Sequence, residues 1–191
     1  MSVWCWCLSA ALSLIVQPIP AFYQSTHVGP SPLWYDPLMV DHAGYLIRSY
    51  NRATGKDLVS LKLLESDPVE AAKQLFHLPG RVVVSHGTQV TPDGPVLNYG
   101  NSMALKRWGA SWEQLTNMAS KYTAEAVEQS ERQAFLSQVL EKGYVENYSG
   151  IRISLDKSRF RMLDGTVWNI VLPEFPGLIG QAATFSQWDD L

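Results

Sequence analysis

Few side chains in this chain are placed to do chemistry. Neither an i,i+4 pair nor an HExxH motif, the usual metal-binding patterns, occurs among its four histidines, His27, His42, His77 and His86. Both cysteines, Cys5 and Cys7, lie near the N-terminus, so residues 38–191 contain no thiol nucleophile, no Cys-based zinc site and no disulfide. GxSxG, Walker and dinucleotide-binding motifs are absent from the sequence. The sequence therefore predicts no catalytic residues and no metal site.

His86 is the histidine whose position suggests a role. It alternates with Val82 and Val84 in a short β-branched segment, so its side chain is expected on the inner face of a strand. There it could line a ligand-binding hollow, act as the base of a small α+β isomerase or dehydratase, or be a hydrogen-bonded core residue. Ser85 would point to the opposite face, which excludes a Ser85–His86 nucleophile and base. A carboxylate paired with His86 would favour the enzyme, and the sequence offers no convincing one.

Three arginines, Arg152, Arg159 and Arg161, lie in a predicted hairpin. A four-residue loop from Leu155 to Ser158 would place Ser154 opposite Arg159 and Arg152 opposite Arg161. One face would then be apolar and the other would carry the three arginines, as a half-buried antiparallel hairpin requires. This interpretation predicts either a surface for an anion or an acidic partner, or a solvated face balanced by nearby carboxylates.

The composition indicates one globular domain whose core is rich in aromatic side chains. The 191 residues are 46% hydrophobic and 17% charged, and the formal net charge of −3 provides no basic stripe for nucleic acid. Seven Trp and eight Tyr suggest a pocket or core lined by aromatic rings. Together with His86, the candidate ligand-binding residues are Asn98, Trp108, Tyr148, Phe160, Trp168 and Gln181. The alternative is that these rings only fill the core.

Residues 1–37 are expected to precede the folded domain, which would span 38–191. Val3 to Val16 is apolar but shorter than the roughly 20 residues that a stable membrane span needs. The segment 1–21 could be a signal for export or organelle targeting, although no Lys or Arg precedes the apolar run. Otherwise this segment is an arm packed on the domain. In that case the protein is cytoplasmic, which is the localisation we expect. Five prolines between Pro18 and Pro37 then predict an extended linker.

The elements that would position these residues follow from periodicity, caps and turns. Helices are predicted over Leu38–Tyr50, from the Asp67–Pro68 cap to Leu78, over Asn101–Trp108, from the Ser111 capping box to Met118, and over Ala124–Lys142 with Thr123 as cap. Strands are predicted over Arg81–His86, Pro95–Tyr99, Tyr144–Ser154, Arg159–Val171 and Leu178–Gln187.

This order predicts an α+β fold. The first strand would lie beside the last, which closes a five-stranded antiparallel sheet with helices on one face and a small hollow between them. Two N-terminal helices would precede this core.

The order of elements is that of a PAS domain, and several segments are more specific. They are VVVSHG from Val82, LNYGNSMAL from Leu97, SKYTAE from Ser120, GYVENYSGIRIS from Gly143, SRFRM from Ser158, VWN from Val167 and GQAATFSQW from Gly180. On these motifs the chain resembles the MEKHLA domain family, a PAS-like group, from about Leu38 to Trp188. Asn101 matches the asparagine often found where the second PAS strand leads into a helix.

The resemblance implies a sensory or protein-interaction domain with no catalytic residues to transfer. The chain has no homeodomain, heptad segment or basic region, so the DNA-regulator role of the plant family members does not transfer. No cofactor is identifiable. A flavin photoadduct needs a mid-domain cysteine, and haem-binding PAS domains usually use a histidine of the long helix; Ala124–Lys142 has none. We therefore expect a small organic ligand, a protein partner, or a homodimer formed through the outer sheet face and the N-terminal helix.

Overall fold

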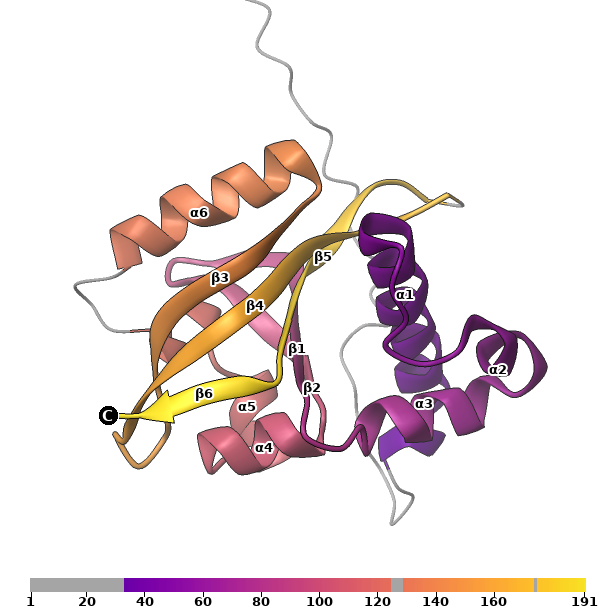
Figure 1. Cartoon of the computed structure of the whole chain (residues 1–191), viewed down its shortest axis with the longest axis horizontal. Coiled ribbons are helices and arrows are strands. Elements are labelled where there is room, and N and C mark those ends of the chain that lie inside the picture. Colours follow the sequence, from indigo (N-terminus) through magenta and orange to yellow (C-terminus); the bar gives the residue numbers. More distant parts are fainter. Residues whose placement is uncertain (1–32, 125–128, 174) are drawn as a thin grey trace, which may run out of the picture.

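A computed structural model describes residues 33–124, 129–173 and 175–191 (Figure 1). The prediction of a targeting segment and linker over residues 1–37 falls mainly outside these ranges. The elements are, in chain order, η2 (Leu33–Tyr35), α1 (Pro37–Thr54), α2 (Leu61–Ser66), α3 (Pro68–Phe76), β1 (Val82–Thr91), β2 (Gly94–Gly100), α4 (Ser102–Trp108), α5 (Trp112–Thr116), η3 (Ser120–Thr123), α6 (Gln129–Lys142), β3 (Tyr144–Ile153), β4 (Arg159–Leu172), β5 (Phe175–Phe185) and β6 (Gln187–Asp190).

The strands form one antiparallel sheet in the order β2–β1–β5–β4–β3. The predicted pairing of the first strand with the last is confirmed, since Val84 lies opposite Ala183 and His86 opposite Gln181. A short sixth strand, β6, pairs with β4 and was not predicted. The fold is α+β, as the sequence indicates.

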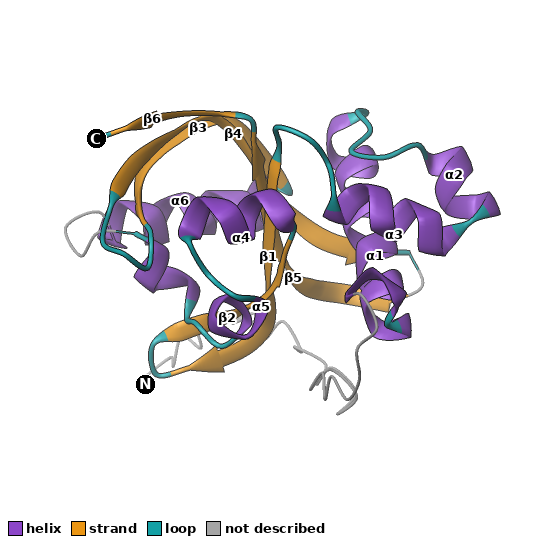
Figure 2. Ribbon diagram, turned by 90° about the horizontal axis from the view of Figure 1, so that it is seen from below, coloured by secondary structure: helices purple, strands orange, loops and turns teal. Residues whose placement is uncertain are grey.

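Helices cover both faces of this sheet (Figure 2). Helices α4 and α5 pack on the inner face, where Trp108 and Leu115 meet Phe160, Met162 and Phe185. Helices α1 and α3 pack on the outer face against Val83, Trp168 and Ile170. The N-terminal helices therefore do not form a separate unit before the core. They are part of it, because they bury the outer face of the sheet.

The predicted helix caps at Asp67 and Ser111 are confirmed. The Asp67 carboxylate accepts the Glu70 amide, and Ser111 forms a capping box with Gln114. The predicted cap of the long helix at Thr123 is wrong. Thr123 ends the 3-10 helix η3, and its hydroxyl donates to the Ser120 carbonyl at 2.7 Å instead of capping α6.

The predicted register of the β3–β4 hairpin is also wrong by one residue. Ile153 lies opposite Arg159 and Arg152 opposite Phe160, so the loop has five residues, 154–158. The loop closes through the Ser154 amide, which donates to the Ser158 carbonyl at 2.9 Å, and through Lys157 in the left-handed region at φ 71°.

This change moves one arginine to the other face of the hairpin, because side chains alternate along a strand. Arg159 and Arg161 are exposed, whereas Arg152 is buried on the inner face. The predicted surface of three arginines therefore does not form.

Asn101 joins β1, β2 and α4. Its side-chain oxygen accepts the amides of Val83 and Ala104, both at 3.0 Å, and its amide donates to the Arg81 carbonyl at 2.8 Å. The residue is fully buried, so it is at once the cap of α4 and the connection between that helix and the first strand.

We expect Asn101→Ala to lower the free energy of unfolding by about 2–4 kcal/mol, because it removes a cap and leaves buried amides without an acceptor. The control is Ser111→Ala in the exposed capping box, which should cost about 1 kcal/mol. Urea unfolding of both variants measures the difference. Equal losses would contradict the connecting role of Asn101.

His42 is a buried polar residue at the interface of α1 with the sheet. Its Nε2 lies 2.9 Å from the Ser85 hydroxyl, which in turn donates to the Asn98 side-chain oxygen at 2.7 Å. Complete burial lowers the pKa of His42 from 6.5 to about 4. The neutral imidazole is thus the form that fits between α1 and β1.

Stability should therefore depend on His42 below neutral pH. Because the unfolded chain binds this proton more tightly than the folded one, the contribution is complete above pH 6.5 and is lost as pH falls toward about 4, by about 3 kcal/mol. Urea unfolding across this range should show a weaker pH dependence in His42→Gln. The exposed-residue control His77→Gln should behave as wild type. An unchanged pH profile in His42→Gln would contradict this assignment.

Candidate ligand-binding pocket

A cavity of about 60 Å³ lies between the inner sheet face and the helical segments that cover it. One water needs about 10–15 Å³, so the space can hold a small molecule or a few waters. Its lining comes from β1–β5, α4, η3 and α6, and comprises Val84, Ser85, His86, Leu97, Trp108, Thr123, Phe135, Tyr148, Arg152, Met162, Val167, Gln181, Ala182, Ala183 and Phe185.

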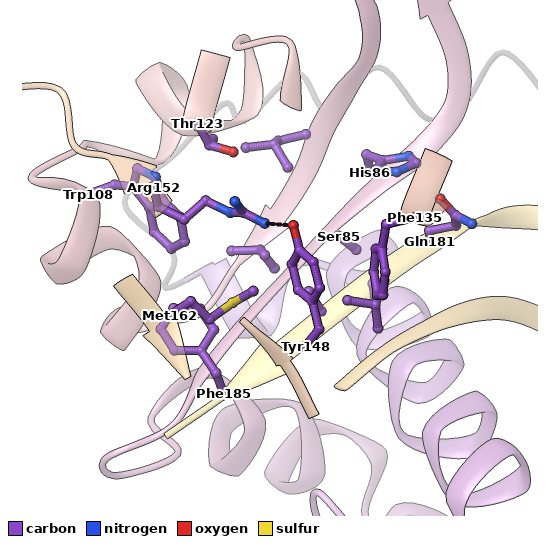
Figure 3. A pocket seen from close by; sticks show the side chains of 15 residues that line it. Ser85, His86, Trp108, Thr123, Phe135, Tyr148, Arg152, Met162, Gln181 and Phe185 are labelled. Carbon is purple, nitrogen blue, oxygen red and sulfur yellow. Dashed lines mark hydrogen bonds between the residues drawn. The ribbon is translucent and has the colours of Figure 1, made fainter. Parts of the chain in front are cut away.

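Four of the predicted ligand-binding residues line this cavity, namely His86, Trp108, Tyr148 and Gln181 (Figure 3). They come from β1, α4, β3 and β5. The fold thus brings together side chains that lie far apart in the sequence, from His86 to Gln181.

Three predicted residues lie elsewhere. Trp168 is on the outer face, because Val167 before it faces inward; its indole nitrogen donates to the Ser49 hydroxyl of α1 at 2.9 Å. Asn98 falls at an irregularity between the pairs Ser85–Tyr99 and His86–Leu97, where it meets the Ser85 hydroxyl.

Phe160 faces inward but is part of the packed core. It is fully buried, and its ring centroid lies 5.3 Å from that of Trp108 and 6.2 Å from that of Phe185. It supports the wall of the cavity rather than lining it.

Arg152 is the pocket residue that the sequence interpretation placed on the wrong face. Its side chain is 8% exposed and extends along the cavity from β3 (Figure 3). The guanidinium donates to the Ile151 carbonyl at 2.8 Å and to the Tyr148 hydroxyl at 3.1 Å. The sequence could have placed Arg152 in the pocket only if the hairpin loop had been assigned five residues instead of four, because that register turns Arg152 inward.

Aromatic side chains form two of the walls of the pocket. Tyr148 stacks on Phe135 of α6, with ring centroids 3.9 Å apart and planes 20° apart. Trp108 of α4 is 3% exposed, and its buried indole nitrogen has no hydrogen-bond partner within the part of the chain that the structure describes. The walls therefore combine apolar surface with one indole N–H that has no described acceptor.

The floor of the pocket is a polar row across three strands. His86 Nδ1 donates to the Gly87 carbonyl at 2.9 Å. Gln181 donates to the Asn169 side-chain oxygen at 2.9 Å, and Asn169 donates to the Val139 carbonyl at the end of α6, also at 2.9 Å. This row connects the floor of the cavity to the helix that forms one of its walls.

Asp and Glu do not occur among the described residues that line the cavity. No cluster of three or more His, Cys, Asp or Glu side chains suited to a metal ion occurs in residues 33–124, 129–173 and 175–191. No helix in these ranges has the length and apolarity needed to cross a membrane. The described pocket residues therefore present a ligand with a mainly apolar surface, one arginine and a few neutral polar groups.

The arrangement of sheet and helices is that of a PAS domain. A PAS domain from Colwellia psychrerythraea superimposes with a TM-score of 0.53 at 13% identity, over 65% of this chain and 98% of that one. An RNA-binding light-oxygen-voltage receptor superimposes with a TM-score of 0.50 at 12% identity, over 71% of this chain and 35% of that one. The chain therefore corresponds to about a third of the receptor, and both similarities concern the fold.

The family is more specific than the fold. The model of the MEKHLA domain matches residues 40–190, and the chain belongs to this family. No curated protein sequence matches the chain.

Gly180 allows β5 to approach the pocket strand β1. A Cβ at this position would lie 2.1 Å from the backbone oxygen of His86, a distance at which the two strands must separate. We expect Gly180→Ala to lower the free energy of unfolding by about 1–3 kcal/mol.

The matched control is Gly44→Ala in α1. There the nearest atom to the new Cβ is the end of the flexible Arg48 side chain at 3.3 Å, and the substitution should be neutral or stabilising because alanine favours helices. Thermal unfolding compares the two variants. A Gly180→Ala protein as stable as wild type would contradict the close approach.

Proposed function

We propose that this MEKHLA domain is a non-enzymatic sensory module that binds a small molecule in the inner pocket. The observation that carries the proposal is the cavity itself, which is lined by aromatic and aliphatic side chains with a few polar atoms directed among them. Membership of a PAS-like family supports the same function. The ligand would be held without a covalent bond.

The alternative, a small enzyme with His86 as base, receives less support. His86 does line the cavity, but the described lining contains no carboxylate that could orient it. The surrounding surface is mainly apolar, which suits binding better than proton transfer. We therefore favour a binding site.

Helix α6 is the element through which binding would be signalled. Its Phe135 stacks on Tyr148 in the pocket wall, and its C-terminal carbonyls are held by Asn169, which is bonded to Gln181 in the floor. A ligand that moves Tyr148 or Gln181 would therefore shift α6. The exposed Leu140 near the end of α6 and the exposed Tyr144 at the start of β3 offer an apolar contact for a protein partner.

A homodimer through the outer sheet face and N-terminal helix stays a prediction. Helix α1 already covers β4 on that face, where Trp168 donates to Ser49. A second copy would therefore contact α1 itself rather than bare sheet at this point.

Native mass spectrometry of the purified protein tests the proposed ligand. We expect a small bound mass that is lost on denaturation and that is absent from Ala183→Leu, whose larger side chain would fill the cavity. Ala53→Leu in α1, on the far side of the sheet, is the control and should retain the ligand. Wild-type protein without a bound mass, or a bound mass that survives Ala183→Leu, would contradict the proposal.

A further inference from the structure

Among the residues that the structure describes, the buried charge of Arg152 has no opposite charge in an ion pair with it. The side chain is 8% exposed, and its two described acceptors, the Ile151 carbonyl and the Tyr148 hydroxyl, are both neutral. Removing a charge from water is costly unless it meets a counter-charge and further hydrogen bonds. This site provides hydrogen bonds but no protein carboxylate among the described residues of its lining.

Arg107, on helix α4, is an arginine of the same domain that does have an ion-pair partner, and it can be compared with Arg152. Its guanidinium forms an ion pair with Asp190 of β6 and lies 4.0 Å from the centre of the Phe160 ring. Arg152 likewise lies beside an aromatic ring, that of Tyr148 at 5.4 Å, but no ion pair accompanies it within the described chain. Within the described residues, Arg152 therefore differs from Arg107 in having no carboxylate partner.

The pocket supplies the rest of an anion site. A guanidinium carries five N–H donors in a planar fork that matches a carboxylate, and the described bonds of Arg152 use two of its nitrogens. The Trp108 indole N–H is a further buried donor in the same lining. The Tyr148 hydroxyl accepts from Arg152, so its own hydrogen can be donated to a ligand.

Charge and size limit the class of ligand. One arginine neutralises one negative charge, which favours a monoanion over a doubly charged phosphate ester. The other walls include Leu97, Met162 and Phe185, and the cavity measures about 60 Å³, so the remainder of the ligand should be apolar and short. We infer that the pocket binds a small monocarboxylate, with its carboxylate on the Arg152 guanidinium and its apolar tail against the inner sheet face. This inference rests on the proposed ligand-binding function.

The test compares butyrate with its uncharged analogue butyramide in a buffer without chloride. Binding is followed by the indole N–H signal of Trp108 in a two-dimensional NMR spectrum, assigned with Trp108→Phe. We expect wild-type protein to bind butyrate about ten- to a hundredfold more tightly than butyramide, as a charge-assisted pair of hydrogen bonds would require.

Substitutions at the arginine separate charge from shape. Arg152→Met should bind both compounds equally, and Arg152→Lys should retain only part of the preference because an ammonium lacks the planar fork. The control Arg161→Met removes an exposed arginine of the same hairpin and should keep the full preference. The wild-type comparison stands by itself should a variant at position 152 fail to fold.

Each result has a distinct meaning. A preference for butyrate that is lost in Arg152→Met supports the inference. Equal binding of the two compounds to wild-type protein overturns the carboxylate site and leaves the proposed pocket intact. A Trp108 signal that neither compound shifts overturns the inference, whereas the proposed function is decided by the bound mass in native mass spectrometry.

Discussion

The pairing of β1 with β5 is the interaction on which the rest of this domain depends. It joins the first two strands of the sheet to the three strands β3–β5, and it requires Gly180 to face the His86 carbonyl without a side chain. One face of the closed sheet is filled by α1 and α3, with polar contacts at Ser49 and His42. The other face is covered by shorter helical segments, and there the packing leaves a cavity.

Local signals made much of this fold predictable from the sequence. Caps such as Asp67 and Ser111 act within one helical turn, so their effect does not depend on the tertiary structure. The first and last strands could be paired because the element order of a five-stranded sheet allows few closures. His86 could be placed on the inner face because side chains alternate along a correctly identified strand.

The remainder depended on details that a single sequence does not determine. The hairpin pattern favoured the register that separates Ile and Phe from Arg, yet the Ser154 backbone closes a longer loop and turns Arg152 inward. That solution places a charge where hydrophobic patterning predicts an apolar residue, and such exceptions are expected at functional sites. Trp168 was misplaced because the sequence alone did not show that α1 would cover the outer face.

Arg152 is the residue on which the inferred anion site depends. The most direct measurement is a crystal structure of the protein soaked with butyrate. We expect density for the carboxylate at roughly 2.7–2.9 Å from the Arg152 guanidinium, with the hydrocarbon chain against Met162 and Phe185. Density that places the carboxylate away from Arg152, or an Arg152 side chain paired with a carboxylate of the protein, would contradict it.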